Sequence, residues 1–420
     1  MQIVSEAGLG PVLGALPGGP RVVAGGNFAT PWQALSVLDA AVATYQLFML
    51  NAQPGVPDRN GVILESPFVG PGMRGRAGLR CFPCRLSLVP ALLAGALPPD
   101  VVLVQTSVPA NGAVSLGTEV NVLPAAIETV RARSGLVIAQ LNTQMPYTYG
   151  DAVLPVDQVD YAIETDVPLP SPPERPARDS SASIGGRVTT LVPDGATLQL
   201  GIGAVPDAVL SALRGRHGLT VWSEMFSDGV LALHKAGVLD PGQQITASFA
   251  FGSAELYDLM DRNPNIAMLR TETTNDPARI ALRPQMISVN TALQVDLFAQ
   301  ANASRVHGLI YSGFGGQTDF VVGALHSSGG LAIIALPSWH PKANVSTVVP
   351  RLDGPVTSFQ HSFIVSDQGQ AAIWGHDASA RADHRSGRAP VRPPRTARSR
   401  TQARMPGLGP RHGDQGPRSW

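Results

Sequence analysis

Cysteine, lysine, charge in general and long apolar runs are all scarce in this chain of 420 residues. Only 2 residues are cysteines, and the only lysines are Lys235 and Lys342. So few thiols exclude a fold held together by disulfides and suit a reducing compartment, so we expect a cytoplasmic protein. No apolar run approaches the length of a membrane span, and the first residues lack the basic start of a signal peptide, so we expect no membrane association.

The two cysteines stand together as 81-CFPC-84. A C-x-x-C pair supplies only two of the four ligands of a typical zinc site, and the chain contains no second pair. We therefore expect structural cysteines and no bound metal.

Charge is low, at 15% of residues, and it is unevenly distributed although the net charge is zero. Ten of the 31 basic residues, but only two of the 31 acidic ones, fall in residues 381–420. This Arg- and Pro-rich tail has no apolar period, which predicts disorder, and its composition resembles translation of GC-rich DNA in a shifted frame. Because no aromatics interleave its arginines and the rest of the chain is acidic, we expect no nucleic-acid binding.

Residues 1–183 predict an N-terminal α/β domain that ends in a linker. Continuous runs of Val, Ile and Leu indicate strands buried on both faces, hence a mainly parallel sheet covered by helices. The predicted strands are 21–28, 45–50, 100–107 and 135–142, with helices at 32–45 and 122–134. Five prolines among charged residues and serines at 166–183 predict the linker.

Residues 184–380 predict a second α/β domain. Its predicted strands are 197–204, 219–224, 245–252, 286–290 and 331–338, with helices at 207–216 and 229–240. Two consecutive α/β domains would leave a cleft between them, where small-molecule sites are common.

The segment 198-LQLGIGAVPDAVL-210 predicts a strand, a glycine turn and a helix, an arrangement that suits an anion. Its G-x-G-x-x-P pattern lacks the third glycine of a dinucleotide site, but Glu224 ends a strand about twenty residues further on, so an NAD-dependent dehydrogenase stays an alternative. Glu224 itself is open to two interpretations, a reactive carboxylate at a strand end or a carboxylate that caps the next helix.

Three further features are ambiguous when taken alone. The cluster 312-SGFGGQTDF-320 allows a close backbone approach to a ligand, although a tight turn is the simpler interpretation. Asn275 is a common turn former before Asp-Pro. Lys342 would by default be a solvated loop residue.

Several longer stretches occur in a distinctive order. In the first half they are 25-GGNFATPW-32, 115-SLGTEVNVLPAAIE-128 and 144-QMPYTYGD-151; in the second half they are 200-LGIGAVPDAVL-210, 223-SEMFSDGV-230, 248-SFAFGSAELYD-258, 274-TNDP-277, 288-SVNTALQVDL-297 and 313-GFGGQTDF-320. Together they resemble the acetyl-CoA hydrolase/transferase family, and within it the 4-hydroxybutyrate CoA-transferase-like branch of glutamate-dependent CoA-transferases.

The resemblance implies two consecutive CoA-transferase-type α/β domains with a cleft between them, and a homodimer that acts on acyl-CoA and a small carboxylate. It implies Glu224 as covalent nucleophile, which forms a glutamyl-CoA thioester, with the Asn275 amide and the Gly316 backbone N–H stabilising the oxyanions. The positions it assigns to CoA binding are Gly201, Ile202, Gly203, Ala204, Val205, Gly313, Gly315, Phe320 and Lys342.

We therefore expect a CoA-transferase that moves CoA between acetyl-CoA, or a similar short acyl-CoA, and a carboxylic acid. One alternative is an acetyl-CoA hydrolase that uses the same glutamate. Another is an inactive CoA-binding protein, because the family's closing helices are not found after Ala380.

Overall fold

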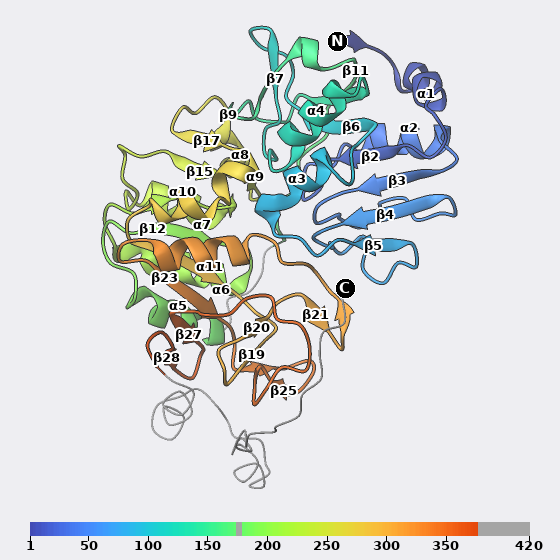
Figure 1. Ribbon diagram of the computed structural model, residues 1–420. Coiled ribbons are helices and arrows are strands. Elements are labelled where there is room, and N and C mark those ends of the chain that lie inside the picture. Colours follow the sequence, from blue (N-terminus) through green and yellow to red (C-terminus); the bar gives the residue numbers. More distant parts are fainter. Residues whose placement is uncertain (174–178, 377–420) are drawn as a thin grey trace, which may run out of the picture.

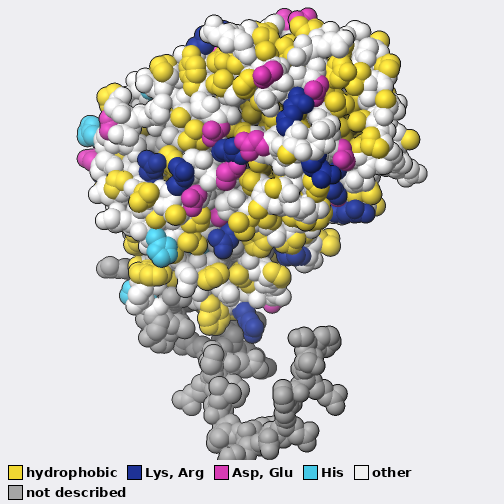
Figure 2. Space-filling model, turned by 45° about the horizontal axis from the view of Figure 1, so that its top comes forward, with side chains coloured by type: hydrophobic (Ala, Val, Ile, Leu, Met, Phe, Trp, Pro, Cys, Tyr) yellow, Lys and Arg dark blue, Asp and Glu magenta, His cyan; other side chains and the backbone are white. Residues whose placement is uncertain are grey.

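The computed structural model describes residues 1–173 and 179–376, which form two α/β domains side by side (Figure 1). The disorder expected for residues 381–420 lies outside the described residues, as do the last residues that precede helix α5. No helix in the described ranges is long and apolar enough to cross a membrane. On the face drawn in Figure 2, acidic and basic side chains are interspersed among apolar ones.

The first domain is built on an eight-stranded sheet in the order β1-β11-β8-β6-β2-β3-β4-β5, and every neighbouring pair is parallel. Its strands are β1 (Gln2–Ile3), β2 (Arg21–Ala24), β3 (Tyr45–Phe48), β4 (Val62–Ser66), β5 (Leu79–Cys81), β6 (Val101–Thr106), β8 (Leu136–Asn142) and β11 (Tyr161–Thr165). The central strand β6 is buried along its whole length, as its apolar sequence predicts.

Helices cover both faces of this sheet. Helices α1 (Glu6–Gly14) and α2 (Trp32–Ala41) pack on one face through Leu13 and Leu38. The other face is covered by α3 (Val89–Ala94) and α4 (Leu123–Ala132). The predicted three-layer α/β architecture is confirmed here.

The second domain has a six-stranded sheet in the order β13-β12-β18-β23-β27-β28, parallel except for its last pair. Its strands are β12 (Thr197–Leu200), β13 (Thr220–Val221), β18 (Met286–Asn290), β23 (Leu331–Ala335), β27 (Phe363–Val365) and β28 (Gln370–Ala372). Helices α5 (Asp179–Thr189) and α6 (Ala204–Ala212) share a hydrophobic core with one face of this sheet, and α10 (Pro277–Ala281) and α11 (Gln317–His326) with the other.

Smaller elements connect these layers. The helices are η1 (Leu86–Leu88), η2 (Val156–Gln158), η3 (Leu213–Gly215), α7 (Asp228–Lys235), α8 (Ala254–Met260) and α9 (Thr271–Thr274). The strands are β7 (Ala113–Ser115), β9 (Tyr149–Gly150), β10 (Val153–Pro155), β14 (Met225–Phe226), β15 (Ile245–Ala247), β16 (Phe249–Ala250), β17 (Ile266–Met268), β19 (Gln294–Asp296), β20 (Ala301–Asn302), β21 (Arg305–Val306), β22 (Leu309–Ile310), β24 (Trp339–His340), β25 (Val345–Ser346) and β26 (Val348–Val349).

Three sequence-based boundaries need correction. The linker is shorter than the predicted 166–183, because α5 already begins at Asp179 and buries Ile184 and Val188 against the core. Within the strand expected at 219–224 only β13 forms, and Glu224 does not end a strand but lies between β13 and β14, directly before Met225. Likewise 245–252 divides into β15 and β16, since the chain changes pairing partner at Ser248.

The two domains are joined by backbone pairing and by a shared core. Strand β9 of the first domain pairs in parallel with β17 of the second. The backbone N–H of Val120 donates to the Ser248 carbonyl at 2.9 Å, and the N–H of Ala250 donates to the Thr118 carbonyl at 2.8 Å. One hydrophobic cluster runs through both domains, which therefore pack as a single body.

Candidate active site

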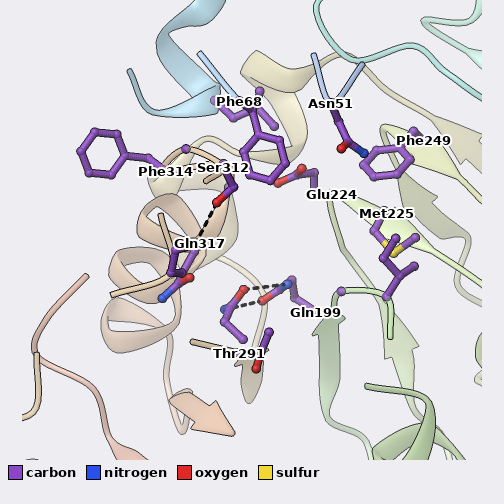
Figure 3. A pocket seen from close by; sticks show the side chains of 18 of the residues that line it. Asn51, Phe68, Gln199, Glu224, Met225, Phe249, Thr291, Ser312, Phe314 and Gln317 are labelled. Carbon is purple, nitrogen blue, oxygen red and sulfur yellow. Dashed lines mark hydrogen bonds between the residues drawn. The ribbon is translucent and has the colours of Figure 1, made fainter. Parts of the chain in front are cut away.

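A cavity of about 270 Å³ lies between the domains. Its first-domain wall is formed by Asn27, Leu50, Asn51, Phe68, Leu86 and Asn121. The second domain contributes Glu224, Gln199 and Asn290 together with residues 313–317 (Figure 3). Glu224 is the only charged residue among those that line the cavity in the described part of the chain. The cleft predicted between two α/β domains is thus present, and one carboxylate, that of Glu224, lines it.

Backbone hydrogen bonds hold Glu224 at the cavity. Its carbonyl accepts hydrogen bonds from the N–H groups of Ser248 and Phe249, at 2.9 and 3.1 Å. The half-buried side chain points into the cavity (Figure 3). Its Oε2 atom accepts a hydrogen bond from Asn275 Nδ2 at 3.2 Å. The carboxylate of Glu224, between β13 and β14, is thereby fixed in the wall of the cavity.

Gly316 can approach Glu224 this closely only because it has no side chain. It directly precedes α11, and a Cβ atom built on it would lie 1.9 Å from Glu224 Oε2 and 2.3 Å from Asn275 Nδ2. Its backbone N–H also hydrogen-bonds the Glu224 carboxylate. Glu224, Asn275 and Gly316, which the sequence places on three separate elements, therefore meet at one oxygen atom.

Burial and a neighbouring charge determine the protonation of Glu224. Desolvation raises the pKa of Glu224 to about 7, and the negative charge of Asp319 acts in the same direction, while the hydrogen bonds from Asn275 and Gly316 lower it. Asp319 is itself buried in α11, where Ser87 of the first domain donates to it through Oγ at 2.8 Å and through N at 3.1 Å. The ionised form of Glu224 therefore becomes dominant as pH rises through about 7.

Two hydroxyl groups behind Asn275 orient its side-chain amide. Its Oδ1 atom accepts a hydrogen bond from Thr274 Oγ1 at 2.8 Å, and Thr274 Oγ1 lies 2.6 Å from Ser248 Oγ. All three side chains are buried. Because the carboxylate accepts, Asn275 must present Nδ2 to it and Oδ1 to Thr274, so the hydrogen bonds run from Thr274 through Asn275 to Glu224. The Oγ of Ser248 donates to the Leu269 carbonyl at 2.8 Å and lies behind Thr274.

The glycine turn lies at the edge of the cavity. Gly201 and Ile202 line it, Gly203 has a φ of 118° that favours glycine, and α6 begins at Ala204, with Val205 turned into the core. This arrangement leaves the first N–H groups of α6 next to the cavity, where an anion would be favoured.

Two residues assigned to CoA by resemblance lie elsewhere. Phe320 is fully buried among core residues such as Ile280 and Ala324, and Lys342 is exposed between β24 and β25. Neither lines the cavity, whereas Gly313 and Gly315 do. Direct contact of Lys342 with CoA stays a prediction, and the KM for acyl-CoA of Lys342→Ala would test it.

The sequence reasoning missed a polar group on the first-domain wall. Asn27, Asn51 and Asn121 have φ values of 40°, 45° and 41°, and the buried side chain of Glu119 lies behind them. A signal was present, because asparagine favours this left-handed backbone, and each of the three shortly follows an apolar run or strand.

Comparison with known proteins identifies the chain. Models of the acetyl-CoA hydrolase/transferase N-terminal and C-terminal domains match residues 23–170 and 252–384. The 4-hydroxybutyrate coenzyme A transferase of Clostridium kluyveri is 39% identical over 313 residues, which are 71% of this chain and 72% of that protein. This chain belongs to the acetyl-CoA hydrolase/transferase family. Glu224 lies between the two matched ranges.

Solved structures of similar proteins support this assignment to the acetyl-CoA hydrolase/transferase family. RipA from Yersinia pestis superposes with a TM-score of 0.85 at 28% identity, over 91% of this chain and 93% of that one. A 4-hydroxybutyrate CoA-transferase from Porphyromonas gingivalis gives a TM-score of 0.76 at 30% identity, over 91% and 92% of the two chains. The protein is thus an enzyme of the CoA-transferase and acetyl-CoA hydrolase kind, and the dehydrogenase alternative is set aside.

Proposed function

We propose that the enzyme transfers CoA from a short acyl-CoA to a carboxylic acid through a covalent thioester on Glu224. The observation that carries this proposal is the meeting of three residues: Asn275 Nδ2 donates to Glu224 Oε2 at 3.2 Å, and the Gly316 backbone lies close to the same oxygen atom. Donors at the Glu224 carboxyl group would stabilise the negative charge that develops on its oxygen when the CoA thiolate attacks the glutamyl carbonyl. One such donor is typically worth about 3 kcal/mol of barrier.

The reaction proceeds through exchanges at carbonyl carbons. The Glu224 carboxylate attacks the acyl-CoA carbonyl, the C–S bond breaks, and an acyl-glutamyl anhydride and CoA thiolate form. The thiolate then attacks the glutamyl carbonyl and releases the first carboxylate, which leaves glutamyl-CoA. An incoming carboxylate repeats both steps in reverse, so a new acyl-CoA leaves and the Glu224 carboxylate is restored.

We assign the second-domain edge of the cavity to CoA. The glycine turn at Gly201 and Gly203 and the start of α6 supply backbone N–H groups there. The acyl group then faces the first-domain wall. The relatives named above suggest 4-hydroxybutyrate among the acids that can accept CoA, and the homodimer stays a prediction that light scattering in solution would test.

Hydrolysis is the second candidate function. Acetyl-CoA hydrolases of fungi are also similar to this chain, the one from Saccharomyces cerevisiae at 29% identity over 267 residues. Either activity would use the same glutamyl-CoA thioester, and only the attacking group, water or a carboxylate, would differ.

One incubation separates the candidates. The full-length protein is mixed with acetyl-CoA and a panel of short carboxylic acids, and the acyl-CoA products are resolved by mass. New acyl-CoA species that require an added acid support transfer, whereas acid-independent release of free CoA supports hydrolysis. If neither product forms, an inactive CoA-binding protein is the better interpretation.

A further inference from the structure

A buried carboxylate in the first domain has no part in the proposed reaction. Glu119 is 3% exposed, and its Oε2 atom has no hydrogen-bond partner in the described part of the chain. Burying such a group without a cation is costly, and desolvation raises the pKa of Glu119 to about 7. A group retained at this cost next to a cavity calls for a role beyond packing.

The other oxygen of Glu119 collects three donors. Its Oε1 accepts hydrogen bonds from the Gly26 N–H at 3.2 Å, from Asn27 Nδ2 at 3.0 Å and from Asn121 Nδ2 at 3.4 Å. Oε1 therefore acts as an acceptor whether or not the group is protonated, because a proton would reside on Oε2. The amide nitrogen of Asn27 is thus held toward Glu119 in both states.

The orientation of the Asn27 amide determines how Asn51 is oriented at the surface of the cavity. With its nitrogen bound to Glu119, Asn27 presents Oδ1 to the other side, where Asn51 Nδ2 donates to it at 3.0 Å. Asn51 reaches into the cavity from the first-domain wall (Figure 3). Its Oδ1 atom, the last of the chain, has no partner among the described residues. The wall that faces the acyl group therefore ends in a hydrogen-bond acceptor.

We infer that Glu119 is a positioning residue that, through Asn27, holds the Asn51 amide oxygen toward the acyl group and so sets specificity. Acyl groups with a neutral, hydrogen-bond-donating end would be favoured, and those that end in a carboxylate disfavoured. The inference rests on the proposed function. It agrees with the absence of any Lys, Arg or His among the cavity-lining residues of the described chain, which leaves a second carboxylate without a counter-charge.

Three four-carbon acids test this selection in the full-length enzyme. Butyrate, 4-hydroxybutyrate and succinate differ only at the end far from the reacting carboxylate. With acetyl-CoA as donor, we expect kcat/KM for 4-hydroxybutyrate to exceed that for butyrate by about fivefold, the effect of one neutral hydrogen bond. We expect succinate to fall at least about tenfold below butyrate. Comparable values for succinate and 4-hydroxybutyrate would overturn the inference.

Variants show whether Glu119 sets the preference. In Glu119→Met the acceptor that holds the Asn27 amide nitrogen is lost and Asn27 is free to turn, so the ratio of kcat/KM for 4-hydroxybutyrate to that for butyrate should fall to about one. Glu65→Met is the matched control, because Glu65 is equally buried in the first domain, pairs with Arg21 and does not line the cavity. We expect this control to keep the wild-type ratio.

The direct substitution of Asn51, the last residue of the hydrogen-bonded chain, keeps the test decisive if Glu119→Met does not fold. Asn51→Leu should remove the preference for 4-hydroxybutyrate without improving succinate. An unchanged ratio in either variant, or an equal loss for all three acids in Asn51→Leu, would show that Asn51 does not meet the acyl end and would overturn the inference. Absence of transfer to all three acids in the wild-type enzyme would instead overturn the proposed function, and this inference with it.

Discussion

At the scale of single residues, Glu224 is subject to opposing influences. Desolvation and the charge of Asp319 raise its pKa, and the hydrogen bonds from Asn275 and Gly316 lower it. A partly desolvated carboxylate is a better nucleophile than one in water, but less of it is ionised at a given pH. With its pKa raised to about 7, Glu224 is about half ionised at neutral pH.

The first prediction concerns pH. Because the ionised form attacks, kcat/KM should rise as pH increases through about 7 and then level off. Asp319→Asn removes a negative charge that raises the pKa of Glu224, so the midpoint of the profile should move to lower pH. Asp39→Asn, far from the cavity wall, serves as the control. A midpoint that stays in place or moves upward in Asp319→Asn would contradict this electrostatic account.

At the scale of elements, helix α9 ends at Thr274, whose hydroxyl orients the side-chain amide of Asn275. Thr274→Val keeps the shape of the side chain but removes the hydroxyl that donates to Asn275 Oδ1. We expect kcat to fall about tenfold, or about 1.4 kcal/mol, because the amide is then free to turn away from Glu224. The measurement is steady-state kinetics with acetyl-CoA and a fixed acid.

Two companion variants distinguish orientation from packing in α9. Thr274→Ser retains the hydroxyl and should recover most of the activity. Thr271→Val alters a threonine of the same helix that is just as buried but whose Oγ1 has no partner among the described residues. Equal losses in Thr271→Val and Thr274→Val would refute a specific role for Thr274.

The start of α11 gives a second prediction at this scale. Gly316→Ala should lower kcat by at least about 100-fold, because its Cβ would occupy the space of Glu224 Oε2 and force the carboxylate from its position. Gly186→Ala is the control: this residue lies in α5, and an added Cβ meets nothing within 4 Å. Wild-type activity in a folded Gly316→Ala protein would show that the close approach is not needed.

The layers of both domains were predictable from sequence because buried parallel strands leave long Val, Ile and Leu runs, as in β6 and β8. Short elements were not, since β13 and β14 have two residues each and depend on pairing with distant strands. The resemblance placed Glu224, Asn275 and Gly316, which the fold brings together. The resemblance gives no side-chain directions, so it does not predict that the side chain of Phe320 lies in the core.

At the scale of the whole molecule, the site depends on both domains at once. The ring of Phe28 stacks on that of Phe251 across the boundary, with centroids 3.5 Å apart. The same hydrophobic cluster extends through both sheets, so the wall that holds Asn51 and the wall that holds Glu224 are fixed relative to one another. In the proposed reaction, Glu224 of one domain would act on an acyl group bound against the other.

The most direct test of the central claim is detection of the covalent intermediate on Glu224. Acyl-CoA alone, followed by borohydride, should convert the Glu224 thioester to an alcohol, and the tryptic peptide of residues 217–235 should lose one oxygen and gain two hydrogens. Glu224→Ala should abolish this change and transfer. Glu224→Asp should be almost as damaging, because the carboxylate retreats by about 1.5 Å and a misplacement of about 1 Å can cost about 100-fold. An unmodified peptide in an active enzyme, or full activity in Glu224→Asp, would contradict the account.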